Sequence, residues 1–132
     1  MNDPVSAKLS LPDPLIAIVG ATDAQHKYGS IIYRNLKRKG YRVVGINPTR
    51  STVDGDPCFR SLADLPENPD IVNIVVPPQR TLRVLEAAAA VPDVAIWIQP
   101  GAADQAVRER AAELDVPTLI DACIMVEARS TV

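Results

Sequence analysis

The feature that most constrains the fold is the stretch of residues 15–22, an apolar run that ends in a glycine and small residues. A segment with helical periodicity, residues 30–39, follows it. A buried strand that turns through Gly20 into a helix leaves backbone N–H groups pointing out of the turn, where they can bind a phosphate. The stretch therefore predicts the first strand and helix of an α/β fold that holds a nucleotide.

Five short apolar runs are predicted as strands: residues 15–19, 43–46, 71–76, 94–98 and 118–120. Three of them are almost continuous in Val and Ile, which is typical of strands covered on both faces of a parallel sheet. Three segments with helical spacing lie between the runs: residues 30–39, 79–90 and 102–114. The alternation predicts a Rossmann-like, doubly wound parallel sheet of five strands in the order 3-2-1-4-5.

The first helix has a clear amphipathic pattern, whereas the segment after the second predicted strand is irregular. In the first helix, Tyr28, Ile32 and Leu36 are spaced four apart and are expected to face the core. Residues 50–69 contain Gly55 and several prolines, so at most a short helical turn near residues 61–65 is expected there.

Length and composition limit the class of protein. The 132 residues suit one domain with a core that needs neither a metal nor a disulfide, with residues 1–14 as a loose arm and residues 15–132 as the domain. The arm has no basic start followed by an apolar stretch, so no signal peptide or membrane span is predicted. Cys58 and Cys123 lack metal-like spacing, which favours a reducing, cytoplasmic location. A net charge of -2 and 4% aromatic residues argue against a nucleic-acid partner.

Ligands of such sheets bind beyond the carboxyl ends of the strands, where the winding reverses. All the distinctive short motifs fall there: Gly20-Ala21-Thr22, Asn47-Pro48, Val76-Pro77-Pro78, Gln99-Pro100-Gly101 and Asp121-Ala122-Cys123. Gly20 allows a sharp turn, Ala21 lets the backbone approach a ligand, and Thr22 adds a hydroxyl. Lys27 follows within reach of a phosphate. The second and third glycine of the dinucleotide fingerprint are missing, so this motif leaves the ligand open.

The end of the second predicted strand argues against NAD. Enzymes that bind NAD usually place an Asp or Glu there, whereas this strand ends in Asn47-Pro48. Arg50 comes next, and a cation there suits an extra ribose phosphate, either the 2′-phosphate of NADP or the 3′-phosphate of coenzyme A (CoA). Val76-Pro77 forms an apolar lip whose Val76 carbonyl could accept from an adenine amino group, although two prolines also simply begin a helix.

No catalytic constellation is predicted. The single histidine, His26, has no evident carboxylate partner, and Cys58 falls in the irregular connection. Cys123 has the character of a small buried hydrophobe, although a thiol beside a crevice could be oxidised. The sequence therefore predicts neither catalytic residues nor metal ligands.

In combination, these motifs resemble the stand-alone CoA-binding protein family, small relatives of the nucleotide domain of succinyl-CoA synthetase alpha subunits. The resemblance covers about residues 15–127. It is carried by Gly20-Ala21-Thr22, Lys27, Gly40-Tyr41-Arg42-Val43, Asn47-Pro48, Ser61-Leu62, Trp97-Ile98-Gln99-Pro100-Gly101 and Asp121-Ala122-Cys123. Thr22 replaces the commoner Ser and keeps the hydroxyl. The catalytic histidine domain of the synthetases has no counterpart in these residues, so their activity is not carried over.

The resemblance implies a non-enzymatic protein that binds CoA or an acyl-CoA, with a protein partner or a homo-oligomer left open. It assigns the pyrophosphate to Gly20, Ala21 and Thr22. It places Asn47 and Pro48 beside the ribose, Val76 and Pro77 beside the adenine, and Gln99 in the same rim, and Lys27 and Arg50 are the candidates for the phosphate charges. An oxidoreductase using NAD(P) and an adaptor that has lost its ligand remain alternatives with the same fold.

Overall fold

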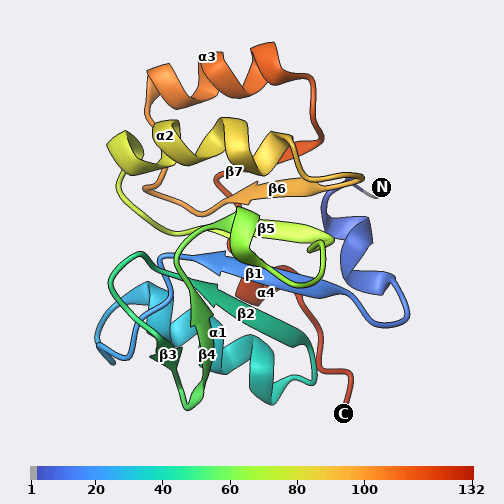
Figure 1. Cartoon of the computed structure of the whole chain (residues 1–132). Coiled ribbons are helices and arrows are strands. Elements are labelled where there is room, and N and C mark those ends of the chain that lie inside the picture. The colour runs from blue at the N-terminus through green and yellow to red at the C-terminus, as the bar shows by residue number, and fades with distance from the viewer. Residues whose placement is uncertain (1–2) are drawn as a thin grey trace.

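The computed structural model describes residues 3–132 and shows a sheet covered by helices on both faces (Figure 1). The strands are β1 (Leu15–Val19), β2 (Arg42–Ile46), β3 (Thr52–Val53), β4 (Asp56–Phe59), β5 (Ile71–Ile74), β6 (Ala95–Ile98) and β7 (Thr118–Ile120). The helices are α1 (Tyr28–Arg38), α2 (Pro78–Ala89), α3 (Gln105–Leu114) and α4 (Ile124–Glu127), with short 3-10 helices η1 (Ser6–Ser10) and η2 (Leu62–Asp64). The predicted α/β class is confirmed.

The sheet has seven strands in the order β3-β4-β2-β1-β5-β6-β7, and every pair is parallel except β3 with β4. The predicted order was wrong about the run at residues 71–76. That run is β5, which pairs with β1 and does not lie outside β2. The position outside β2 belongs to β4, a strand that was not predicted. With β4 counted as the third, the parallel strands do follow 3-2-1-4-5-6.

The missed strands form a hairpin in the segment that was expected to be irregular. Asp54 and Gly55 both have positive φ angles, 52° and 79°, as a two-residue hairpin turn requires. The prediction failed because β3 is only two residues long and β4 contains Pro57, which breaks the usual strand pattern. The expected helical turn near residues 61–65 is present as η2.

Alternate residues of the central strands pack into two separate cores, one on each face of the sheet. Because both faces are buried, these strands are unbroken apolar runs in the sequence. Ile16, Ile18 and Trp97 face the side covered by α1, α4 and η1. Ala17 and Ile96 face the side covered by α2 and α3. Both predicted features of the sheet, parallel pairing and burial on both faces, are therefore confirmed.

Two local expectations are corrected. In α1, Ile32 and Leu36 are fully buried as expected, but Tyr28, the first residue of the helix, is 63% exposed. Residues 3–14 do not form a loose arm, since Val5 and Leu9 are buried in the core on the α1 side. Within residues 3–132, no helix has both the length and the apolar character needed to cross a bilayer.

Candidate functional site

Two adjoining hollows lie at the carboxyl ends of β1, β2 and β5. Their volumes are about 580 and 620 Å³, and we call them the first and the second hollow. Six residues line both: Gly20, Thr22, Lys27, Asn47, Val76 and Arg80. The two hollows therefore form one cleft. It lies at the carboxyl end of β1, which has β2 on one side and β5 on the other, so the winding of the sheet reverses there.

The turn after β1 is held tightly against the start of α1. Gly20 has φ +102°, and its N–H donates to Ile46 O over 2.9 Å. A Cβ on Gly20 would come within 2.8 Å of Val76 Cγ1, and a Cβ on Gly29 would come within 2.0 Å of the Gly20 carbonyl oxygen. Both positions therefore need glycine. The requirement at Gly29 was not predicted, because it arises from contact between the turn and the helix.

The N-terminus of α1 faces the first hollow with free donors. Its N-cap, Lys27, makes no side-chain cap, and its first turn contains no acidic residue. Within residues 3–132, the N–H groups of Tyr28 and Gly29 donate to no protein acceptor, and both residues line the first hollow. Such a helix end carries a partial positive charge and unpaired donors, so it favours an anion.

The N-terminus of α2 borders the same hollow. Its N-cap is Pro77, which provides no side-chain cap, and Pro77 and Pro78 both line the hollow. The Val76 carbonyl, a predicted adenine contact, accepts from Thr81 Oγ1 over 3.2 Å. A carbonyl oxygen has two lone pairs, so this bond leaves Val76 able to accept a second donor.

Asn47 ties the end of β2 to the turn after β1. Its Nδ2 donates to Ala21 O over 2.9 Å, and its Oδ1 accepts from both the backbone N–H and the hydroxyl of Thr49 at 2.9 Å. The side chain is therefore a brace between two parts of the lining. Pro48 and Thr49 extend the lining into the second hollow.

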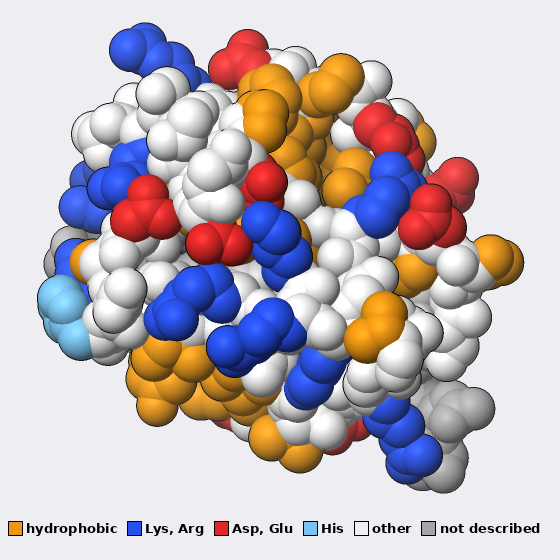
Figure 2. Space-filling view, turned by 90° about the horizontal axis from the view of Figure 1, so that it is seen from below, with side chains coloured by type: hydrophobic (Ala, Val, Ile, Leu, Met, Phe, Trp, Pro, Cys, Tyr) orange, Lys and Arg blue, Asp and Glu red, His pale blue; other side chains and the backbone are white. Residues whose placement is uncertain are grey.

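The lining of the cleft is basic although the chain carries a net charge of -2. Its cations are Lys27, Arg50, Arg60, Arg80 and Arg83, and none of the carboxylates or thiols of residues 3–132 is part of it. The face that carries α1 and the β3–β4 hairpin is different, because Figure 2 shows basic and acidic side chains next to each other there. The cleft is thus set apart by unmatched positive charge, which suits a ligand with several phosphates.

Arg50 is the exception among these cations because it has a carboxylate partner. Its Nη2 lies 2.7 Å from Asp23 Oδ2. The backbone N–H of Asp54, and then Arg50, lower the pKa of Asp23 below its usual value, so this carboxylate stays charged at neutral pH.

Two predicted site residues lie outside the lining. Ala21 is fully buried beneath the turn. Gln99 is 4% exposed and has internal partners, because its Nε2 donates to Cys123 Sγ over 3.5 Å and its Oε1 accepts from the N–H of Ile124 over 2.9 Å. The structure thus gives Gln99 the task of holding α4, while its neighbours Pro100 and Gly101 do line the first hollow.

The other predicted residues meet at the cleft: Gly20, Thr22, Lys27, Asn47, Pro48, Arg50, Val76 and Pro77. Sequence reasoning missed Arg60, Arg80 and Arg83. The available signal was the spacing of Arg80 and Arg83, three apart at the start of a helix that follows a predicted binding lip. His26 also lines the first hollow, and residues 3–132 contain no group of three metal-ligating side chains.

Comparisons with known proteins agree on one family. A family model described as a CoA binding domain matches residues 15–129. An ADP-forming acetate–CoA ligase from Archaeoglobus fulgidus is 33% identical over 72 residues, which are 54% of this chain and 10% of the ligase. The chain therefore matches only about a tenth of that relative's length.

Solved structures show the same fold. A conserved hypothetical protein from Pyrococcus furiosus has a TM-score of 0.81 and 37% identity, covering 86% of this chain and 98% of its own. A protein from Thermus thermophilus has a TM-score of 0.83 and 31% identity, covering 96% of both chains. These two similar proteins match the present chain over nearly their whole length.

Proposed function

The chain belongs to the family of CoA-binding domains, and from that premise we propose that it binds CoA or an acyl-CoA in the cleft without itself catalysing a reaction. CoA contains an adenine, a ribose with a 3′-phosphate, and a diphosphate that leads to the pantetheine arm. A cleft that combines free backbone donors, cations and an apolar lip suits each of these parts.

The observation that carries the proposal is the uncapped start of α1 beside the turn at Gly20. The N–H groups of Tyr28 and Gly29 have no acceptor within residues 3–132, and glycine at positions 20 and 29 keeps this space clear of side chains. These residues fit a diphosphate, whose oxygens would accept from the free N–H groups. Lys27 and the hydroxyl of Thr22 would add further donors.

Neighbouring residues suit the rest of the nucleotide. Asn47 and Pro48 border the ribose side, and Val76 and Pro77 would contact the adenine. The end of β2 offers the amide of Asn47 where an NAD enzyme would need a carboxylate, and that amide already braces the turn. The arrangement therefore favours CoA over NAD.

The proposal of a binding function without catalysis rests on the chemistry of the lining. No carboxylate or thiol of the described residues lines the cleft, so general acid-base or nucleophilic groups are confined to His26, Lys27, Tyr28 and hydroxyls. We expect the protein to sense or deliver the cofactor, or to act as a CoA-binding subunit whose protein partner supplies the chemistry.

Thermal unfolding with added ligands tests this proposal. We expect CoA to stabilise the protein, since a ligand at a hundred times its dissociation constant adds about 2.7 kcal/mol to the free energy of unfolding. Acetyl-CoA should act similarly, because the cleft recognises the nucleotide end. Stabilisation by NAD or NADP alone would indicate an oxidoreductase, and no stabilisation by any of them would indicate an adaptor without a ligand.

A further inference from the structure

We propose that Arg60, Arg80 and Arg83 form a separate subsite in the second hollow that recognises a phosphate on the ribose, such as the 3′-phosphate of CoA. This inference rests on the proposed function, because it takes an adenine nucleotide to lie in the cleft. It assigns the third phosphate to residues other than Lys27 and Arg50, the two cations that the sequence suggested.

The fold brings these three arginines together from two segments. Arg80 and Arg83 lie three apart on α2, so they share one face of the helix. Arg60 stands between β4 and η2, and Leu62 of η2 packs into the same core as Leu85 of α2. All three arginines line the second hollow. The packing of Leu62 with the core on the α2 side therefore brings the segment that carries Arg60 close to α2.

Their charges are unmatched. Within residues 3–132, none of the three forms an ion pair with a carboxylate, whereas Arg42, Arg108 and Arg110 each do. Like charges that share one hollow repel each other until an anion enters. A guanidinium also donates two parallel N–H bonds to phosphate oxygens, which makes arginine well suited to a terminal phosphate.

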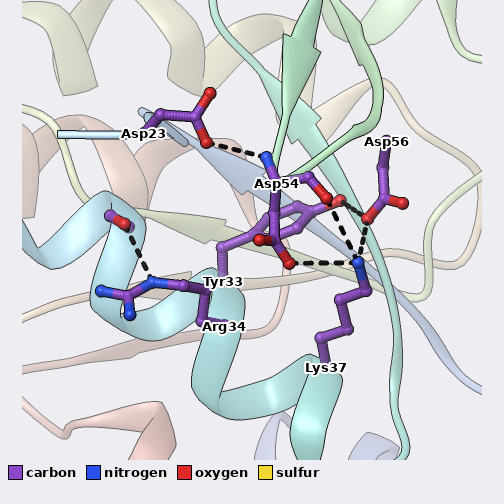
Figure 3. Close-up of polar contacts among 7 residues, drawn as sticks. Asp23, Tyr33, Arg34, Lys37, Asp54 and Asp56 are labelled. Atoms are coloured by element: carbon purple, nitrogen blue, oxygen red, sulfur yellow. Dashed lines mark hydrogen bonds and ion pairs between the residues drawn. The ribbon is translucent and has the colours of Figure 1, made fainter. Parts of the chain in front are cut away.

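Arg50 is less suited to this role because its partner is fixed in place. Asp23 Oδ1 accepts from the backbone N–H of Asp54 over 2.8 Å while Asp23 Oδ2 holds Arg50. Figure 3 shows how Asp54 is secured in turn, since Lys37 contacts both Asp54 and Asp56, at 3.1 and 2.8 Å. The hydroxyl of Tyr33 donates to Asp56 over 2.8 Å. The β3–β4 hairpin thus keeps Asp23 beside Arg50, and Asp23 compensates the positive charge of Arg50.

Lys27 belongs to the other end of the cleft. It is the N-cap of α1 and lines both hollows, beside the free N–H groups that suit a diphosphate. The free backbone donors of α1 thus lie in the first hollow, whereas Arg60 and Arg83 line only the second hollow and Arg80 borders both. This division matches a ligand with two phosphate groups at separate places.

Calorimetric titrations with matched ligands test the inference. We expect CoA to bind at least about tenfold more tightly than dephospho-CoA, because charge-assisted hydrogen bonds to the extra phosphate are the only difference. The double variant Arg80→Gln/Arg83→Gln should lose that preference and keep its affinity for dephospho-CoA, and Arg60→Gln should reduce it. Arg38→Gln removes an exposed charge outside the cleft that has no ion-pair partner among residues 3–132, and it should leave both affinities unchanged.

The outcomes separate the two proposals. If the unaltered protein binds no CoA, the proposed function fails and the subsite with it. If it binds CoA and dephospho-CoA equally, or if the arginine variants keep the full preference, the subsite is wrong while CoA binding stands. Parallel titrations with NADP and NAD identify the source of the phosphate, and a preference for NADP without one for CoA overturns the assignment to the 3′-phosphate. All three arginines are exposed, so the variants should fold.

Discussion

The carboxyl edge of the sheet consists of two halves that look alike in sequence and differ in their hydrogen bonds. The open half, at the ends of β1, β2 and β5, contains Gly20 and Asn47 and faces backbone N–H groups that have no acceptor among residues 3–132. The closed half, at the ends of β6 and β7, contains Gln99 and residues 121–123, while Pro100 and Gly101 after β6 still line the first hollow. There Gln99 holds the N–H of Ile124, and Trp97 Nε1 donates to Ala122 O over 2.7 Å.

The difference teaches that a polar residue on the carboxyl edge can be used inside the protein and need not face the cleft. Both halves carry short polar motifs after a buried strand, as the topology requires. The closed half uses its polar groups to fasten α4, a helix of four residues that makes few hydrogen bonds of its own. The open half leaves donors free, and a buried or half-buried donor without a partner favours a ligand that can supply one.

The largest effect should come from filling the open half. In Gly29→Ala the new Cβ would lie within 2.0 Å of the Gly20 carbonyl oxygen, so either the turn or α1 must move. We expect the free energy of unfolding to fall by roughly 3 kcal/mol and CoA binding to be lost. Gly20→Val should act in the same way, through the contact with Val76 and the positive φ. Urea denaturation and calorimetry measure the two effects.

Gly55→Ala is the matched control for these variants. Gly55 also has a positive φ, +79°, but a Cβ there would meet no atom within 4 Å. We expect a loss of about 1 kcal/mol from backbone strain and no change in CoA affinity. Tight CoA binding by a folded Gly29→Ala protein would show that the ligand does not use the start of α1.

The open half could be predicted from the sequence to a large extent. The unbroken apolar run before Gly20 and the Asn47-Pro48 end of the second strand are local signals, and parallel pairing is sufficient to bring them together. The predicted strand order was wrong because β4, which contains Pro57, was not recognised as a strand. Asp54-Gly55 did indicate a hairpin turn before it. Because β4 was not predicted, the prediction placed β5 outside β2, in the position that β4 occupies.

The sequence also contained no sign of contacts between residues that are distant in the chain. The role of Gln99 depends on Ile124 in α4, which is too short to show a helical period. The grouping of Arg60 with Arg80 depends on how η2 packs against α2. Which residues these side chains contact is decided by tertiary packing, so local sequence patterns do not predict such contacts.

Removing the hydrogen bond between Gln99 and Ile124 would test whether Gln99 stabilises the closed half without contacting the ligand. In Gln99→Leu the buried N–H of Ile124 loses its acceptor, which should lower the free energy of unfolding by about 1–3 kcal/mol. CoA affinity should stay unchanged because Gln99 does not line the cleft. Urea denaturation can be followed by the fluorescence of Trp97, the single tryptophan of the chain, which lies in the same half.

Gln105→Leu is the matched control because Gln105 is an exposed glutamine on α3, and its effect should stay within about 0.5 kcal/mol. A Gln99→Leu protein of normal stability that binds CoA poorly would place the side chain in contact with the ligand. The two halves would then form a single rim.

The smallest effect is a difference in response to acid. Behind the open half, the pKa of Asp23 is lowered by the Asp54 N–H and Arg50, and the pKa of Asp56 is lowered chiefly by Lys37. A lowered carboxyl pKa means that these contacts are intact above the unfolded value of about 3.9 and are lost as the pH falls through the folded values. The Gln99 and Trp97 bonds of the closed half are neutral and do not titrate in this range.

Amide NMR between pH 7 and 3 can therefore compare the two halves in one sample. The N–H of Asp54, which donates to Asp23, should shift with a midpoint below that of an ordinary aspartate, while the indole N–H of Trp97 should stay nearly constant. Lys37→Gln should raise the midpoint of Asp56 and should also change the Asp54 signal, because Lys37 contacts both carboxylates. If the Trp97 signal instead titrates together with Asp54, the two halves are coupled, and the closed half depends on the same charges as the open one.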